Sequence, residues 1–363
     1  MNIVASTSGM TKRLGRVRWF LSFAAMSVAS FAAEDSMWEW DSQNSGVKTS
    51  IRALCSVDAR VCWFGTGKGT IGRTTDGGKS WERFIVKGAE DVEFRDVEAV
   101  DAMRCVAMSV GEGEASRIYR TADGGKTWQL GYQNKAPKGF FDGMAFWDAE
   151  NGILAGDPVD GHLFLLRTAD GGATWKRMDS TPKMKVGEHA FAASGTHVAV
   201  VPGGHVWVGS GGQVARVFYS KNFGKSWVAL DTPVIAGEAS TGIFSIAFKN
   251  SQEGIAVGGD YTKEAVGERN AIETSDGGKT WRLLKYAARP SVFSFRSCVR
   301  YVQDAEMVIV VGPDGCDVSR DEGKTWNPFG DQGFHAVSVG ESSSAIWAAG
   351  SNGRLARLRQ RRD

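Results

Sequence analysis

The sequence predicts an all-β protein whose strands form one seven-bladed β-propeller, closed by its N-terminal strand in a three-plus-one arrangement. Three observations predict this fold. A turn motif recurs six times at intervals of 45 to 54 residues, and an apolar strand pattern recurs seven times out of phase with it. The last unit lacks an outer strand, and an unassigned strand-like segment near the N-terminus supplies one. A repeat period of this size is typical of blades or solenoid units.

The first part of the chain reads as an export signal. Basic residues at 12–18 precede an apolar run at 19–29, and residues 30–32 place small side chains where a signal peptidase reads them. We therefore expect residues 1–32 to be a signal peptide and residues 33–363 to be one propeller domain, located in the periplasm or outside the cell. An uncleaved membrane anchor is the alternative. The net charge is only +2, which does not favour nucleic acid as a partner.

The turn motif reads Ser/Thr-x-Asp-x-Gly-x-Ser/Thr-Trp, and each residue in it has a structural role. Asp-Gly-Gly between alternating strands is a hairpin signal. The carboxylate accepts backbone N–H groups of its own turn, glycine adopts the positive φ, and the indole packs on the neighbouring unit. We interpret the motif as a structural turn clamp. Its paired positions are Asp76 and Trp81, Asp123 and Trp128, Asp170 and Trp175, Asn222 and Trp227, Asp276 and Trp281, and Asp321 and Trp326.

Two chemical interpretations of the glycine-rich segments fail. Gly-Lys-Ser/Thr recurs in five copies of the turn motif, but a phosphate-binding loop needs an earlier glycine that no copy has. Gly67, Gly69 and Gly72 have the spacing of a dinucleotide fingerprint, but a strand and a turn follow them instead of a helix. No Cys/His spacing typical of a zinc site occurs. We therefore expect no catalytic residue, no cofactor and no metal.

The strand pattern recurs once more often than the turn motif, and we assign it to the inner strand of each blade. The last copy is followed by two strands and then by the chain end, so the segment 36–43 near the N-terminus completes that blade and protects its edges. The seven copies are SIRALCSV (50–57), EFRDVEAV (93–100), FFDGMAFW (140–147), EHAFAASG (188–195), IFSIAFKN (243–250), SFRSCVRYV (294–302) and FHAVSVG (334–340).

Aligning these strands places one residue per blade at an equivalent position, with an apolar residue usually before it. Alternation along a strand sends the two kinds of side chain to opposite faces. In a propeller the inner strands line the central channel, where ligands commonly bind. The aligned residues are Arg52, Arg95, Asp142, His189, Ser245, Arg296 and His335.

This mostly basic ring is the predicted partner-binding site, at the mouth of the channel. Arginine suits carboxylates through its planar fork, so we expect Arg52, Arg95 and Arg296 to bind an acidic segment of a partner or a small anion. In the alternative, the ring residues form hydrogen bonds with one another and with water, and no ligand binds. The polar insertion at 258–270 is a further candidate binding loop.

Cys55 and Cys62 are candidates for a disulfide. If Asp58 and Ala59 form a two-residue hairpin turn, the two cysteines lie directly opposite each other on adjacent strands. An oxidising compartment then favours a cross-strand bridge. Two buried thiols are the alternative.

The repeated turn motif is identified as the Asp box, or BNR repeat, of sialidases, some large glycanases and the photosystem II stability/assembly factor family. The chain resembles the last of these most, over residues 36 to 358, in its signal peptide, its single propeller and its boxes in nearly every blade. The segments GDPVDGHLFLLRTADGGATW and GGQVARVFYSKNFGKSW resemble bacterial members. The resemblance implies a monomeric assembly factor or scaffold that binds an exported or membrane-associated protein without chemistry.

A sialidase-like glycoside hydrolase, with a glycan as its ligand, is the alternative function. Sialidases share the boxes and an arginine cluster, but they also have an early Arg-Ile-Pro motif, a paired tyrosine nucleophile and six blades. Hydrolysis by two carboxylates requires a facing pair, and Asp142 is the only acid of the ring, with Glu188 beside the ring position in its own strand. Bacterial relatives sometimes carry an oxidoreductase label, which no motif here supports.

Overall fold

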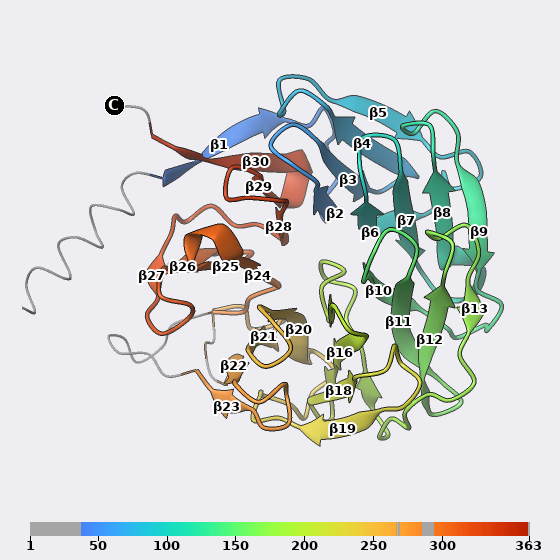
Figure 1. Ribbon diagram of the computed structural model, residues 1–363, viewed down its shortest axis with the longest axis vertical. Coiled ribbons are helices and arrows are strands. Elements are labelled where there is room, and N and C mark those ends of the chain that lie inside the picture. The colour runs from blue at the N-terminus through green and yellow to red at the C-terminus, as the bar shows by residue number, and fades with distance from the viewer. Residues whose placement is uncertain (1–37, 266, 268, 285–293, 362–363) are drawn as a thin grey trace, which may run out of the picture. The chain divides into compact units, whose positions relative to one another are not determined.

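The computed structural model describes residues 38–265, 267, 269–284 and 294–361, so the expected signal peptide lies outside the described residues. The chain divides into one large unit, Trp40–Arg359, and a small unit made of Met1–Glu39 and Gln360–Asp363. Seven sheets surround the centre of the large unit (Figure 1), which confirms the predicted seven-bladed propeller. Within the described part of the chain, no helix has the length and apolar character needed to span a membrane.

Blades one to three follow the sequence from the innermost strand outwards. Their strands are β2 (Ile51–Ser56), β3 (Cys62–Thr66), β4 (Thr70–Thr74) and β5 (Glu82–Ile85), then β6 (Glu93–Ala99), β7 (Cys105–Val110), β8 (Arg117–Thr121) and β9 (Gln129–Gln133), then β10 (Phe141–Phe146), β11 (Gly152–Val159), β12 (His162–Thr168) and β13 (Lys176–Arg177).

Blades four to six follow the same order. Their strands are β15 (Val198–Val201), β16 (His205–Gly209), β18 (Arg216–Ser220) and β19 (Val228–Asp231), then β20 (Thr241–Phe248), β21 (Gly254–Asp260), β22 (Ala271–Thr274) and β23 (Arg282–Leu283), then β24 (Cys298–Val302), β25 (Met307–Gly312), β26 (Gly315–Ser319) and β27 (Asn327–Pro328). Three short 3-10 helices lie in connections: η1 (Gly113–Ala115), η2 (Gln303–Ala305) and η3 (Ser351–Gly353).

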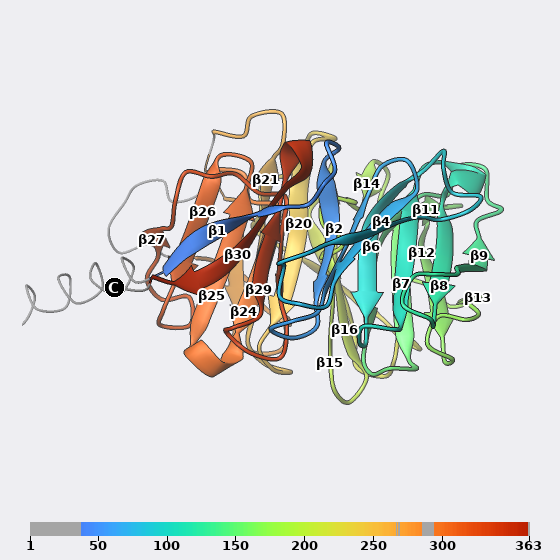
Figure 2. The same cartoon turned by 90° about the horizontal axis from the view of Figure 1, so that it is seen from above.

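The seventh blade combines the first strand of the described chain with the last three. Its order from the inside is β28 (Ala336–Val339), β29 (Ile346–Ala349), β30 (Arg354–Gln360) and β1 (Trp38–Asn44). Figure 2 shows β1 running beside β30. The predicted three-plus-one closure is therefore confirmed, and it removes the free edge that an open ring would leave.

The hydrophobic core lies between neighbouring blades. One cluster contains Trp63 of blade one together with Phe94 of blade two, and another contains Phe64 of blade one together with Trp347 of blade seven. The second strand of each blade is buried along most of its length because both of its faces meet another blade. Trp63, Trp207 and Trp347 are completely buried in these interfaces.

The inner strand predicted for blade four is wrong. Its first two residues form β14 (Glu188–His189), which pairs with β17 (Gly211–Gly212) at the inner edge of the sheet of blade five. The innermost strand of blade four is β15 instead. Residues 190–197 connect β14 to β15 and belong to neither strand; they are called the channel segment here. They are mostly small, and Gly195 has a φ of +73°, which an extended strand does not allow.

The predicted disulfide is also wrong, because both thiols are free. The turn is longer than two residues: the Val57 amide donates to Val61 O, and the Asp58 carboxylate accepts two amides of the turn. Cys62 therefore pairs with Ser56, while Cys55 pairs with Trp63. A shift of one residue reverses the face of a strand.

Each Cys therefore faces a different blade. Cys55 accepts the amide of Ala99 in blade two, whereas Cys62 packs with Trp347 of blade seven. Burial raises the pKa of both thiols.

The first Asp box shows how the repeated turn is held. Asp76 Oδ1 accepts the Ser80 amide at 3.0 Å, and Asp76 Oδ2 accepts the Ser80 hydroxyl at 2.6 Å. Thr74 Oγ1 donates to the same carboxylate and accepts the amide of Gly78, which has a φ of +88°. Asn222 reproduces this arrangement in blade four, since its Oδ1 accepts the Ser226 amide and its Nδ2 donates to the Ser226 hydroxyl.

We expect Asp76→Asn to make stability less sensitive to acid. Hydrogen bonds from the side chain and backbone of Ser80 lower the pKa of Asp76 to about 2, below its ordinary value of about 4. A carboxyl group whose pKa is lowered by folding stabilises the fold at pH values above its pKa in the unfolded chain. This contribution is lost as the pH falls through its pKa in the folded protein. In urea unfolding at pH 6, the native protein should have a larger free energy of unfolding than Asp76→Asn. This difference in free energy should be smaller at pH 2. The same difference in free energy of unfolding at pH 6 and at pH 2 would contradict this expectation.

Candidate functional site

A pocket of ≈ 380 Å³ opens where the inner strands begin. Blades one, two, five and seven each contribute one side chain from the inner strand or next to it, and blade six contributes Phe295, Ser297 and Pro313. Residues of the channel segment and of the 258–270 insertion complete the lining. The residues used below are Arg52, Arg95, Phe244, Ser297 and His335 from the blades, Phe191, Ala192 and Ala193 from the channel segment, Phe295 from the approach to blade six, and Tyr261 and Glu264 from the insertion.

Four of the inner strands have a β-bulge near their first residues. The pairing register breaks on either side of Arg52 in blade one, Arg95 in blade two, Asp142 in blade three and Phe244 in blade five. A bulge leaves one residue out of the ladder and changes the direction of its side chain. This local irregularity aims Arg52 and Arg95 into the mouth of the channel.

Two ring residues predicted from the sequence are displaced by one position. In blade five the bulge residue is Phe244, and Ser245 is buried behind it, accepting the Val299 amide at 3.0 Å. In blade six the amide of Ser297 donates to Val311 O, and the next residue, Cys298, pairs with Val311. Ser297, directly before β24, is therefore the residue that lines the pocket in blade six. The alignment was wrong at Ser245 and Arg296.

Arg296 points away from the pocket as a consequence. Its guanidinium forms ion pairs with Asp317 at 2.6 Å and with Asp314 at 2.6 Å. Arg296 and Asp317 are both buried. This arginine connects two strands of blade six and does not line the channel mouth.

Asp142 and His189 also lie outside the pocket lining. Asp142 occupies the bulge of blade three but is fully buried, and burial, followed by the charge of Asp157, raises its pKa well above the ordinary value. His189 lies in β14, with its Nδ1 3.0 Å from Ala190 O and its ring edge against Phe191. Of the predicted ring, the structure therefore brings Arg52, Arg95 and His335 together.

The basic side of the pocket is held by the channel segment. Arg95 donates to Ala192 O at 3.1 Å, and Arg52 donates to Ala193 O at 3.4 Å. Arg95 also pairs with Glu93 at 3.1 Å. Burial and the charge of Arg95 lower the pKa of Arg52, as expected for two cations that face one cavity.

His335 contributes a neutral imidazole. Burial, followed by the charges of Arg52, Arg95 and Arg354, lowers its pKa to about 3. Its Nε2 lies 2.9 Å from the Ser351 hydroxyl. At neutral pH the positive charge of the pocket therefore comes from the arginines.

The opposite wall is aromatic, and the sequence alignment did not predict it. Phe191 of the channel segment stacks on Phe244 with ring centroids 3.8 Å apart. The ring of Phe295 packs edge-on against Phe244, with centroids 4.7 Å apart. The ring centroid of Tyr261, in the insertion, lies 6.0 Å from that of Phe244. The sequence predicts the insertion at 258–270 as a candidate binding loop, but no local pattern marks Phe191 or Phe244 as part of a shared surface.

The pocket is suited to a ligand with an anionic group beside an apolar one. Two guanidinium groups can donate charge-assisted hydrogen bonds to a carboxylate, and the aromatic wall can cover an apolar side chain. Among the described residues, no group of three or more His, Cys, Asp or Glu could hold a metal ion.

Comparison with known proteins places this geometry in a structural context. The chain is similar in structure to YCF48. It matches YCF48 bound to a D1 peptide with a TM-score of 0.62 and 16% identity, over 90% of this chain and 96% of that one. It matches YCF48 from Cyanidioschyzon merolae with a TM-score of 0.60 and 14% identity, over 89% and 98% of the two chains. No protein-family model and no curated protein matches the sequence.

A third likeness is to an enzyme. The chain matches the GH74 xyloglucanase from Xanthomonas campestris with a TM-score of 0.55 and 15% identity, covering 83% of this chain and 51% of the enzyme. This chain therefore spans about half of the xyloglucanase. At such identities, the likenesses to YCF48 and to the xyloglucanase establish a shared propeller fold.

Proposed function

We propose that this chain is an exported, non-catalytic binding protein that holds an acidic, partly apolar segment of a protein partner in the channel-mouth pocket. The observation that carries the proposal is the convergence of Arg52 and Arg95, from adjacent blades, opposite the wall of Phe191, Phe244 and Phe295. Carboxylates of the partner would pair with the guanidinium groups. An apolar side chain beside them would cover the phenyl rings, where its burial is favourable.

Two further observations support a role in protein binding. The Asp boxes resemble those of the photosystem II stability/assembly factor family, and the fold is similar to that of YCF48, which has been solved with a D1 peptide bound. The pocket is also lined in part by Tyr261 and Glu264, which lie on an inserted loop at its rim. Loops on a rigid scaffold commonly carry binding residues.

The test compares two double charge reversals with the same change in net charge. Arg52→Glu with Arg95→Glu removes the basic side of the pocket, and Lys79→Glu with Lys126→Glu alters two exposed lysines of Asp boxes. The probe is a pool of short peptides that combine Asp or Glu with Phe or Leu, and calorimetry measures the affinity of the peptide that binds best. We expect the pocket variant to bind at least about 30-fold more weakly, since losing a partner of a buried charge pair costs about 2–5 kcal/mol.

The control variant should bind within about twofold of the native protein, because exposed charges contribute little at physiological salt. Circular dichroism would check that both variants are folded. Equal binding by the pocket variant and the native protein would overturn the proposal. Release of reducing sugar from xyloglucan or of sialic acid from a sialoside would favour the Asp-box glycoside hydrolase alternative.

A further inference from the structure

Three blades place a tryptophan at the same position in their interface with the next blade. These are Trp63, Trp207 and Trp347, each in the second strand of its blade. They pair across the sheet with Arg73, Tyr219 and Arg357, respectively. Each indole is completely buried. The indole N–H of Trp63 donates to Asp101 O at 3.0 Å and that of Trp207 donates to Gly277 O at 2.9 Å, both on turns of the following blade.

Two of these indoles, those of Trp63 and Trp347, lie against their paired arginines. The guanidinium carbon of Arg73 lies 5.3 Å from the ring centroid of Trp63, and that of Arg357 lies 5.3 Å from the centroid of Trp347. Arg357 also donates to Gly77 O, the first glycine of the Asp box in the next blade. In blades one and seven the indole therefore lies against an arginine of its own blade, whereas in blade four Trp207 stacks on Tyr219.

Blade two retains the arginine and lacks the indole. Val106 occupies the tryptophan position and pairs with Arg120. Arg120 Nε donates at 3.0 Å to Gly171 O, the first glycine of the Asp box of blade three, as Arg357 does to Gly77. Valine is much smaller than tryptophan, so the space that an indole fills in blades one, four and seven is left open.

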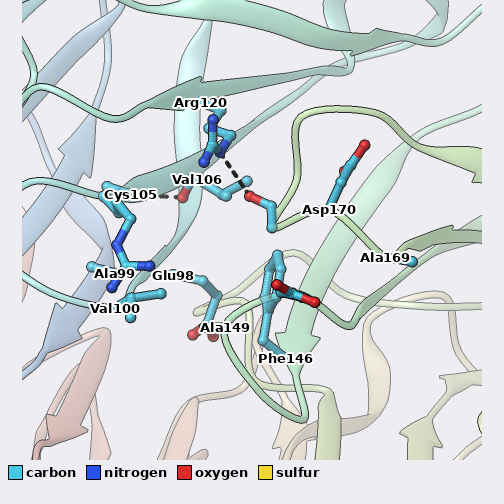
Figure 3. A pocket seen from close by; sticks show the side chains of 13 residues that line it. Glu98, Ala99, Val100, Cys105, Val106, Arg120, Phe146, Ala149, Ala169 and Asp170 are labelled. Atoms are coloured by element: carbon cyan, nitrogen blue, oxygen red, sulfur yellow. Dashed lines mark hydrogen bonds between the residues drawn. The ribbon is translucent and has the colours of Figure 1, made fainter.

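A pocket of ≈ 390 Å³ occupies this space between blades two and three. Figure 3 shows Val106, Phe146, Glu98 and Arg120 around it, with the hydrogen bond from Arg120 across its upper edge. The cavity also reaches Ala149. This residue lies on the turn of blade three that corresponds to the blade-two turn contacted by Trp63.

We propose that this pocket binds an aromatic ring that carries an N–H donor, of the indole class. Val106 and Phe146 supply apolar contact, and the guanidinium of Arg120 is available to one face of the ring, as the guanidinium groups of Arg73 and Arg357 are in their blades. A backbone carbonyl of the turn at Ala149 and the carboxyl group of Glu98 can accept the N–H. The ring is either that of a small molecule or a tryptophan side chain of another protein.

Glu98 fits the acceptor role. It is half-buried at the inner end of the pocket, and burial raises its pKa to about 7, against the opposing charge of Arg300. A carboxyl group in this state still has a carbonyl oxygen that accepts an N–H group, whether or not the other oxygen carries a proton.

The corresponding cleft between blades five and six is less suitable. Ile255 stands there at the tryptophan position and pairs with Glu273 in place of an arginine. The cleft is smaller, ≈ 160 Å³, and the anionic side chain of Glu273 would face the negative face of a ring. This difference makes blade five a matched comparison for blade two.

The pocket is independent of the proposed partner site. Arg95 lies near the start of β6 and contributes to the channel mouth, whereas Glu98 and Ala99 lie at the end of the same strand and line the pocket between the blades. A loss of binding at one site is therefore distinguishable from a loss at the other.

The test measures binding of free indole and of N-acetyl-tryptophanamide by isothermal titration calorimetry. Benzothiophene, which has a ring of similar size without the N–H, is the chemical control. Val106→Trp fills the pocket with the protein's own indole, and Ile255→Trp makes the same change in blade five. We expect saturable binding of at least one N–H ligand to the native protein, and weaker binding of benzothiophene. Val106→Trp should lose at least about tenfold in affinity, and Ile255→Trp should stay within about twofold.

Tighter binding of free indole would indicate a small-molecule ligand, and tighter binding of N-acetyl-tryptophanamide would indicate a tryptophan side chain of another protein. If Val106→Trp does not fold, Arg120→Met provides the second test, and we expect it to weaken binding about threefold to tenfold by removing the cation. The proposal is overturned if neither N–H ligand binds the native protein, or if both substitutions leave the affinity unchanged.

Discussion

Replacing Asp317 with alanine should lower the free energy of unfolding by about 3–5 kcal/mol, the usual cost of leaving a buried charge without its partner. Asp317 lies on β26 and accepts two N–H groups of Arg296, at 2.6 and 3.0 Å. Both residues are about 5% exposed. The alanine variant would keep a guanidinium in a low-dielectric interior, with Asp314 at the surface as a remaining partner.

Urea unfolding monitored by tryptophan fluorescence checks this expectation. Asp314→Ala is the matched control, because the side chain of Asp314 is 43% exposed and its ion pair should contribute less than about 1 kcal/mol. Combining Arg296→Met with Asp317→Leu should recover much of the loss, since apolar side chains of similar size commonly replace a buried ion pair. A loss below about 1 kcal/mol in Asp317→Ala would show that the pair is solvated.

Trp347→Ala should also destabilise the fold by about 3–5 kcal/mol, because it opens a large cavity in a well-packed interface. Trp347 is fully buried between blades seven and one, with the ring of Trp81 edge-on at 5.5 Å. The outer strand of blade seven comes from the opposite end of the described chain, so we expect this blade to open first when the interface is weakened.

Thermal and urea unfolding measure the loss, and amide hydrogen exchange locates it. Faster exchange in β28 and β29 of Trp347→Ala than in β15 and β16 of blade four would show that the closing blade opens first. Ile85→Ala is the control, because Ile85 is 68% exposed and its replacement should change stability by less than about 0.5 kcal/mol. Equal losses in the two variants would contradict the packing argument.

The blade count and closure could be predicted because they depend on local, repeated patterns. Asp76 and its counterparts mark each outer hairpin through hydrogen bonds within one turn, and these need no information from other blades. The unassigned strand near the N-terminus and the missing strand at the C-terminus pointed to the same arrangement, β1 beside β30.

The candidate site could be predicted only in part. Arg52, Arg95 and His335 line the pocket as the alignment predicts, but the bulge at Phe244 and the place of Ser297 directly before β24 shift the alignment by one residue in blades five and six. A bulge depends on the register between two strands, and one extra residue leaves the composition of either strand unchanged. For the same reason, the longer turn after Ser56 separated the two cysteines that a shorter turn would have paired.

Local sequence patterns were thus enough to establish a closed seven-bladed propeller, its repeated turn clamps and two arginines at its channel. Contacts between segments far apart in the chain established the rest: the channel segment beneath those arginines, the aromatic wall opposite them, and the open space that Val106 leaves beside Arg120. The physical reason is that hydrogen bonds within a turn and alternation within a strand are encoded over a few residues. A pocket depends on which side chains meet when separate blades pack together, and on how far each strand has shifted against its neighbour.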